Sequence, residues 1–117
     1  MINPKFSSQK KNAQFSTVID ISPEDLKTNM SAVHIVDVRR PDEWQSNLPA
    51  LESALRITLD TLPNNLSKLP KDKALVFVCR SGGRSAQASA WAKENGFSEV
   101  YNMAGGMTEW HKIFSAT

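Results

Sequence analysis

The only cysteine of the 117-residue chain lies in a segment rich in glycine and arginine. This segment reads CRSGGRSA over residues 79–86, follows the apolar run ALVFV and precedes the alanine-rich QASAWAKEN. The thiol therefore comes where a buried strand is expected to end and a helix to begin. In such a loop, backbone N–H groups and the positive end of the helix dipole point toward a common centre, which favours a bound anion.

The residue types in this loop predict an anion cradle with the sulfur of Cys79 at its floor. Gly82 and Gly83 are expected to adopt positive φ and let the backbone curl round a bound group. Arg80 and Arg84 add two permanent positive charges that suit tetrahedral oxyanions. This setting favours the thiolate, so we expect a nucleophilic sulfur near neutral pH. The alternative interpretation is a small buried hydrophobic side chain with solvated arginines and simple turn glycines.

The spacing between Cys79 and Arg84 distinguishes two kinds of cysteine chemistry. Phosphatases that work through cysteine use a Cys-x5-Arg loop, which surrounds a phosphate, whereas here four residues separate the two and Ser85 follows. A shorter loop encloses a smaller volume, so it suits one sulfur atom attached to the cysteine better than a phosphoryl group.

Short strands alternate with short helices, a pattern that predicts an α/β fold with a mostly parallel central sheet flanked by short helices. Strands are predicted over 17–21, 33–38, 74–78 and 99–103, and helical segments over 23–27, 41–46, 62–70, 85–95 and 107–114. Residues 47–61 show no clear pattern beyond a brief extended segment at Ile57. Asp37 and Cys79 both come at strand ends, where ligands of parallel sheets gather.

Length and charge indicate one domain over residues 16–117, preceded by a flexible N-terminal tail over residues 1–15. Three lysines of the tail account for the excess of positive charge: without them, 11 of the 14 basic residues remain against 12 acidic ones. We therefore expect no nucleic-acid partner. No apolar run is long enough to cross a bilayer and no signal-peptide pattern is present, so a cytoplasmic location without a membrane partner is expected.

A single cysteine excludes an internal disulfide and a multi-cysteine metal site. His34 and His111 are the only histidines, so no metal is expected. His34 lies in an apolar strand and is expected in the core, and His111 on the surface.

Three stretches give the chain a resemblance to single-domain rhodaneses, which are thiosulfate sulfurtransferases. They are IVDVRRPDEW at 35–44, CRSGGRS at 79–85 and GFSEVYNMAGGMTEW at 96–110, and the resemblance extends over about residues 17–114. It implies a rhodanese-like fold and an exchange that needs no cofactor. In this exchange Cys79 takes a sulfane sulfur from thiosulfate or a persulfide donor. It then passes the sulfur to cyanide or to a thiol acceptor, either a small molecule or a protein.

The resemblance also assigns roles to residues of the site. The side chains of two arginines would hold the sulfonate of the donor, and the loop N–H groups would stabilise the persulfide. The substrate-binding residues are then Arg80, Ser81, Gly82, Gly83, Arg84 and Ser85. Asp37 and Arg39 would brace the loop or line its mouth, the alternative being a turn-capping aspartate and a surface arginine. Glu43 is a weaker candidate.

One segment departs from the family pattern. After the Asp-Val-Arg stretch, rhodanese-like domains commonly carry a Gly-His-Ile-Pro-Gly-Ala-like segment, and NLPALESALRITL here lacks its His and Pro-Gly. This departure affects the expected outer wall of the substrate entrance. Two other functions remain open: a cysteine-dependent phosphatase or arsenate reductase, and a non-catalytic rhodanese-like binding module.

Overall fold

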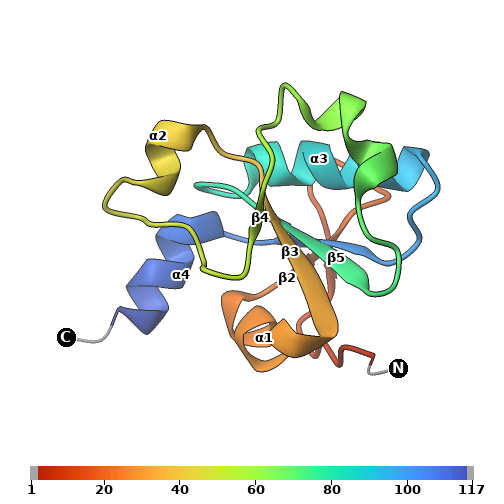
Figure 1. Ribbon diagram of the computed structural model, residues 1–117. Coiled ribbons are helices and arrows are strands. Elements are labelled where there is room, and N and C mark those ends of the chain that lie inside the picture. The colour runs from red at the N-terminus through yellow and green to blue at the C-terminus, as the bar shows by residue number, and fades with distance from the viewer. Residues whose placement is uncertain (1–2, 116–117) are drawn as a thin grey trace.

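The computed structural model describes residues 3–115, in which a six-stranded sheet carries short helices on both faces (Figure 1). The strands are β1 (Lys10–Lys11), β2 (Ile19–Ile21), β3 (Val33–Asp37), β4 (Leu55–Arg56), β5 (Ala74–Val78) and β6 (Val100–Met103). The α-helices are α1 (Pro23–Thr28), α2 (Pro41–Trp44), α3 (Gly83–Glu94) and α4 (Gly106–Phe114). Short 3-10 turns cover Met30–Ala32, Leu62–Asn64 and Leu66–Lys68.

The strands lie in the order β1-β2-β6-β5-β3-β4, and every pair is parallel except β1 with β2. The predicted mostly parallel α/β fold is confirmed. Because β3, β5 and β6 are neighbours, their carboxyl ends meet at one edge of the sheet. The register pairs Asp37 with Val78, so Cys79 begins its loop beside the end of β3. This edge is where side chains from all three strands can converge.

The two faces of the sheet form two hydrophobic layers, because side chains of a strand alternate between faces. One layer packs the sheet against α3 and the 3-10 turns at Leu62–Asn64 and Leu66–Lys68, and includes Val36, Phe77, Leu62, Leu66 and Ala88. The other packs it against α1 and α4, and includes Ile35, Val76, Leu26, Met107 and Trp110. Figure 1 shows α3 on one side of the strands and α1 and α4 on the other. The edge where the carboxyl ends of β3, β5 and β6 meet therefore lies between two packed layers.

The residues at the helix ends have the types that favour those positions. Ser22 caps α1, accepting the N–H of Asp25 on its Oγ at 3.1 Å. Gly96 follows α3 with φ of +92°, the left-handed conformation expected there. The long helix begins at Gly83, two residues before the predicted start at Ser85.

Residues 3–15 differ from the predicted flexible tail, because they have a defined path along the sheet edge. Lys10 and Lys11 form β1, which pairs antiparallel with β2. Ser8 donates to the buried carboxylate of Asp25 through both its N–H and its Oγ, at 2.8 and 2.5 Å. The sheet therefore begins before the predicted domain boundary at residue 16. Residues 1–2 of the predicted tail and residues 116–117 of the predicted domain lie outside the described residues.

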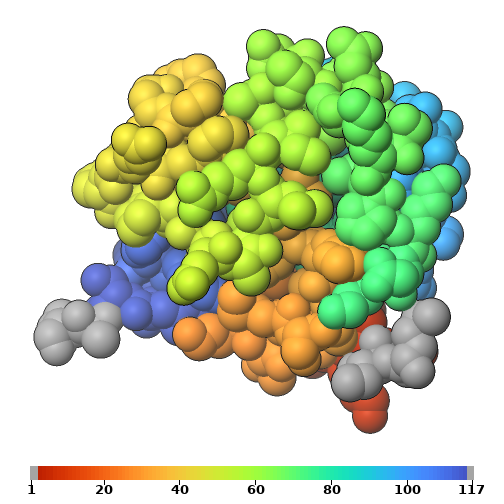
Figure 2. Space-filling model, in the orientation of Figure 1, coloured from red at the N-terminus to blue at the C-terminus, as the bar shows by residue number. Residues whose placement is uncertain are grey.

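The poorly patterned residues 47–61 run across the outside of β3. Only Leu55 and Arg56 pair with that strand, and Ile57 and Leu59 donate their N–H groups to the carbonyls of Asp37 and Val38. In Figure 2 this yellow to yellow-green segment covers much of the face in view. Within residues 3–115, no helix has the length and apolar character needed to span a membrane.

Candidate active site

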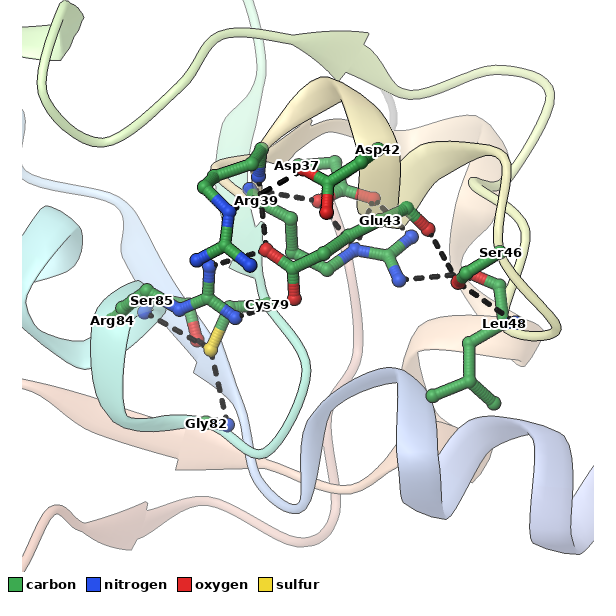
Figure 3. A network of polar contacts seen from close by, with 11 residues as sticks. Asp37, Arg39, Asp42, Glu43, Ser46, Leu48, Cys79, Gly82, Arg84 and Ser85 are labelled. Carbon is green, nitrogen blue, oxygen red and sulfur yellow. Dashed lines mark hydrogen bonds and ion pairs between the residues drawn. The ribbon is translucent and has the colours of Figure 1, made fainter.

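The sulfur of Cys79 lies at the centre of the loop between β5 and α3 (Figure 3). Its Sγ accepts the N–H groups of Gly82 at 3.1 Å and Ser85 at 3.3 Å, and the Ser85 hydroxyl lies 3.2 Å away. The residue is 1% exposed and also borders the core layer under α3. A burial of this kind would suit an inert thiol, but three donors converging on one sulfur suit an anion. Two of the loop amides, those of Gly82 and Ser85, therefore face the sulfur as the anion cradle requires.

Only one of the two loop glycines needs the conformational freedom that was predicted for both. Gly82 has φ of +106° and precedes the first residue of α3, which turns its N–H toward the sulfur. Gly83 is already helical, and no positive φ occurs there. The prediction was wrong for Gly83 because the helix starts earlier than expected.

Arg84 is paired with Glu43 of α2. Its Nη1 and Nη2 donate to the two carboxylate oxygens at 2.6 and 2.8 Å. The hydrogen bond from Arg84, helped by the N–H of Arg40, lowers the pKa of Glu43 to about 2 despite the opposing effect of burial. The same pair raises the pKa of Arg84. Arg80, by contrast, is exposed and contributes its carbonyl to a backbone contact. The two loop arginines therefore have different surroundings.

Glu43 was only a weak candidate from the sequence, yet it is the acidic partner of the loop. It occupies the third position of α2, and its Oε1 accepts the N–H of Arg40 at 3.0 Å, which caps the start of that helix. The signal in the sequence was Pro41 followed two residues later by glutamate, which predicts the cap. Nothing local predicts the contact with Arg84.

Asp37 and Arg39 form a buried ion pair at the end of β3. Both side chains are 0% exposed, and the Arg39 Nε and Nη2 donate to the Asp37 carboxylate at 3.0 and 2.9 Å. Asp37 also accepts the N–H of Arg39, as a turn-capping aspartate does. The remaining Nη1 reaches the carbonyl of Leu48 at 2.8 Å. The surface-arginine alternative is wrong, and the pair ties down the segment that carries Glu43.

Ser85 connects the sulfur to a polar chain behind the loop. Its Oγ lies 2.5 Å from Oδ1 of Asn102, a buried residue of β6, whose Nδ2 donates to Asp20 at 2.9 Å. Asn102 is a residue of the site that was not predicted from the sequence. The available signal was a polar residue inside a short apolar strand, at the carboxyl end where the site lies.

The start of α4 donates backbone hydrogen bonds to the sulfur loop. Met107 donates its N–H to the carbonyl of Cys79 at 2.7 Å, and Thr108 to that of Arg80 at 3.0 Å. Gly106 has φ of +61°, and a Cβ there would lie 2.5 Å from the Cys79 and Arg80 backbones. Nothing in the local sequence predicts this close approach.

A groove lies beside Arg84, between the start of α2, residues 58–60 and α3. It has a volume of about 570 Å³. Its lining includes Val38, Pro41, Leu59, Arg84 and Trp91. Leu59 comes from the segment that departs from the rhodanese pattern, so that segment lines part of this groove.

Comparison with known proteins identifies the family. The model for the rhodanese-like domain matches residues 22–113. A sulfurtransferase of Allochromatium vinosum is 34% identical over 96 residues, covering 80% of this chain and 88% of that protein. A rhodanese-related protein of Thermoplasma volcanium superposes with a TM-score of 0.75 at 26% identity, covering 81% and 92% of the two chains. The human single-domain sulfurtransferase TSTD1 superposes with a TM-score of 0.71 at 25% identity, covering 80% and 95%. The chain belongs to the family of rhodanese-like domains.

Proposed function

We propose that this protein is a sulfurtransferase. It moves a sulfane sulfur from thiosulfate or a persulfide donor to cyanide or a thiol acceptor, through a persulfide on Cys79. The observation that carries the proposal is the convergence of the Gly82 N–H, the Ser85 N–H and the Ser85 hydroxyl on Sγ. The sulfurtransferase relatives support the same reaction class.

In the first step the Cys79 thiolate attacks the outer sulfur of thiosulfate. A sulfur–sulfur bond forms to Sγ, the bond between the two sulfurs of thiosulfate breaks, and sulfite leaves with the bonding electron pair. The negative charge then lies on the new terminal sulfur of the persulfide. In this proposal the N–H groups of Gly82 and Ser85, which already face Sγ, stabilise the attacking thiolate without reorganising, and the other loop N–H groups receive the charge of the terminal sulfur.

In the second step an external nucleophile attacks the terminal sulfur. Cyanide gives thiocyanate, or a thiolate gives a new persulfide, and the thiolate of Cys79 is restored with the bonding pair. Since the chain has one cysteine, no second thiol of the same chain can resolve the persulfide. The acceptor is therefore a separate molecule, either small or a protein. We place this exchange in the cytoplasm, where thiol acceptors stay reduced.

The two loop arginines have different roles in this proposal. Arg80 is exposed at the loop and supplies positive charge for the sulfonate. Arg84 is balanced by Glu43, so it contributes mainly by fixing the loop and by the N–H groups not turned to the carboxylate. The N–H groups of Ser81 and Gly83 complete the set of loop donors that we assign to substrate binding.

The test is the mass of the intact protein after incubation with thiosulfate. We expect a gain of about 32 Da, the mass of one sulfur, which disappears on adding cyanide as thiocyanate is formed. Cys79→Ser should show neither the gain nor thiocyanate formation, and incubation with sulfate in place of thiosulfate is the matched control. An unchanged rate of thiocyanate formation in Cys79→Ser would refute the proposal. Hydrolysis of an aryl phosphate that requires Cys79 would instead support the phosphatase alternative, and a thiol inert to both reagents would support the binding module.

A further inference from the structure

The Ser85 hydroxyl lies between two acceptors but has one proton to give. One acceptor is Oδ1 of Asn102 at 2.5 Å, and the other is Sγ of Cys79 at 3.2 Å. All three side chains are at least 98% buried. Whichever acceptor the proton faces, the other loses it, so Asn102 and the sulfur compete for the same hydroxyl.

The hydrogen bond to Asp20 fixes the orientation of the Asn102 amide. An ionised carboxylate can only accept hydrogen bonds, so the nitrogen of Asn102 must face Asp20 and its oxygen must face Ser85. Nδ2 of Asn102 donates to Oδ1 of Asp20 at 2.9 Å. The same Asp20 oxygen also accepts a hydrogen bond from Nδ2 of Asn12 at 2.9 Å. The chain of contacts thus runs from the N-terminal segment through Asp20 and Asn102 to the hydroxyl beside the sulfur.

We propose that Asn102 is a positioning residue that acts through Ser85 and favours the persulfide over the thiolate. This inference rests on the proposed function. When Sγ is a thiolate, it is the stronger acceptor and draws the Ser85 proton, which leaves Oδ1 of Asn102 without its donor. When Sγ becomes the bridging sulfur of the persulfide, its charge has moved to the terminal sulfur, and the proton returns to Asn102. The thiolate therefore loses part of its stabilisation relative to the persulfide.

The other charged groups near the sulfur do not contact Asn102 or Ser85 through their side chains. They are the Arg84–Glu43 pair, the Asp37–Arg39 pair and Arg80. A substitution at Asn102 leaves these charged groups in place. Asp20 is the one charged group whose side chain loses a hydrogen bond from Asn102. A change in the thiolate can then be traced to the Ser85 proton.

The first experiment compares wild type with Asn102→Leu, which keeps a similar volume without the acceptor. The Ser85 proton then has only the sulfur to face, so the thiolate gains stability. We expect the midpoint of the pH profile of iodoacetamide alkylation to fall by about 0.5 to 1 pH unit. We also expect the ratio of persulfide to free thiol, measured by intact mass at a fixed ratio of thiosulfate to sulfite, to fall by about threefold to tenfold.

Ser85→Ala tests the same competition with the opposite sign, because it removes the donor itself. Its alkylation midpoint should rise and its persulfide fraction should increase. Adding Asn102→Leu to Ser85→Ala should then move neither quantity further, since the connecting hydroxyl is gone. Ser89→Ala is the control: its buried hydroxyl lies one turn further along α3 and donates to the Ser85 carbonyl, not to the sulfur.

The outcomes separate the two proposals. An unchanged or higher midpoint in Asn102→Leu, or a shift that persists in the Ser85→Ala background, would overturn the role of Asn102. Asn102→Ala is the replacement to use if the leucine variant fails to fold, with the same expected signs. A protein that takes up no sulfur in any variant, yet shows the midpoint shifts, would overturn the proposed function and still support the control of the Ser85 proton by Asn102.

Discussion

Glu43 and Arg84 meet at two points, with their oxygen and nitrogen atoms 2.6 and 2.8 Å apart. The Glu43 side chain is 8% exposed and that of Arg84 is 32% exposed, so the pair lies at the boundary of the protein interior. Because Arg84 belongs to the sulfur loop and Glu43 to α2, this ion pair joins the loop to the segment after β3. The geometry of the loop therefore depends on a residue outside it.

Glu43→Gln should reduce stability at neutral pH and flatten its dependence on acid. The pKa of Glu43 falls from its ordinary value of 4.5 to about 2 on folding, so its contribution is complete above 4.5 and is lost as the pH falls toward 2. We expect the variant to lose about 1–2 kcal/mol at pH 7, after allowance for the solvent that reaches Arg84. Urea unfolding between about pH 2 and pH 7 measures this difference, which should shrink on acidification.

The matched control for this prediction is Asp42→Asn. Asp42 pairs with Arg40 at 3.3 Å, but both side chains are more than two-thirds exposed. The control should have nearly wild-type stability at every pH. Equal losses in the two variants would show that the buried pair has no special role.

Arg80→Gln should raise the KM for thiosulfate by about fivefold to tenfold with a smaller change in kcat. Arg80 is exposed beside the loop and is our candidate for the sulfonate charge. Steady-state thiocyanate formation at several salt concentrations measures the effect, which should weaken as salt screens the attraction. Lys68→Gln removes an exposed positive charge on a 3-10 turn and is the control. A KM that stays at the wild-type value in Arg80→Gln would remove this arginine from donor binding.

Gly106→Ala should disrupt the contact between the start of α4 and the sulfur loop. The new Cβ would lie 2.5 Å from backbone atoms of Cys79 and Arg80, which cannot move away as a flexible side chain could. We expect a loss of about 2 kcal/mol or more and at least a tenfold lower rate of thiocyanate formation. Thermal unfolding and the rate assay measure the two effects.

Gly83→Ala provides the comparison for stability. A Cβ at Gly83 meets no atom within 4 Å, and the residue is already helical. This substitution should raise the unfolding free energy by about 0.5–1 kcal/mol. If Gly106→Ala were as stable as Gly83→Ala, the close contact under the loop would be disproved.

Ser8→Ala should destabilise the fold although Ser8 lies in the predicted tail. Burial raises the pKa of Asp25, but the hydrogen bonds from Ser8 and Ser7 together outweigh it and hold that pKa below its ordinary value. The Ser8 hydroxyl also accepts the N–H of Ser22. We expect a lower melting temperature at pH 7, with a smaller difference from wild type below about pH 4. Ser16→Ala, at an exposed position, is the control, and equal melting temperatures would mean that the segment is loosely held.

The parts of the fold that the sequence predicts well are those with local signals. The strand at 74–78 is confirmed at both ends, because five apolar residues lie between a polar turn and the glycine loop. The strand predicted at 17–21 is shorter, at Ile19–Ile21, and residues 55–56 form β4 only through backbone pairing with β3. Such pairing depends on a partner strand that no local pattern identifies.

The same distinction applies to the site. The loop from Cys79 to Ser85 is contiguous, so its donors could be predicted together. Glu43, Asn102 and Gly106 reach the loop from α2, β6 and α4, and their contacts exist only after the sheet has ordered its strands. The sequence analysis assigned both loop arginines to the anion, because the pairing of Arg84 with a distant glutamate leaves no local trace.

The hydrogen bonds between α4 and the sulfur loop form late in the synthesis of these two elements. The carbonyls of Cys79 and Arg80 accept the amides of Met107 and Thr108 at the start of α4. Because α4 follows the loop in the sequence, Cys79 leaves the ribosome before these amides do. A nascent chain that has not yet added α4 therefore lacks both hydrogen bonds, and its sulfur loop is braced only once this helix has folded.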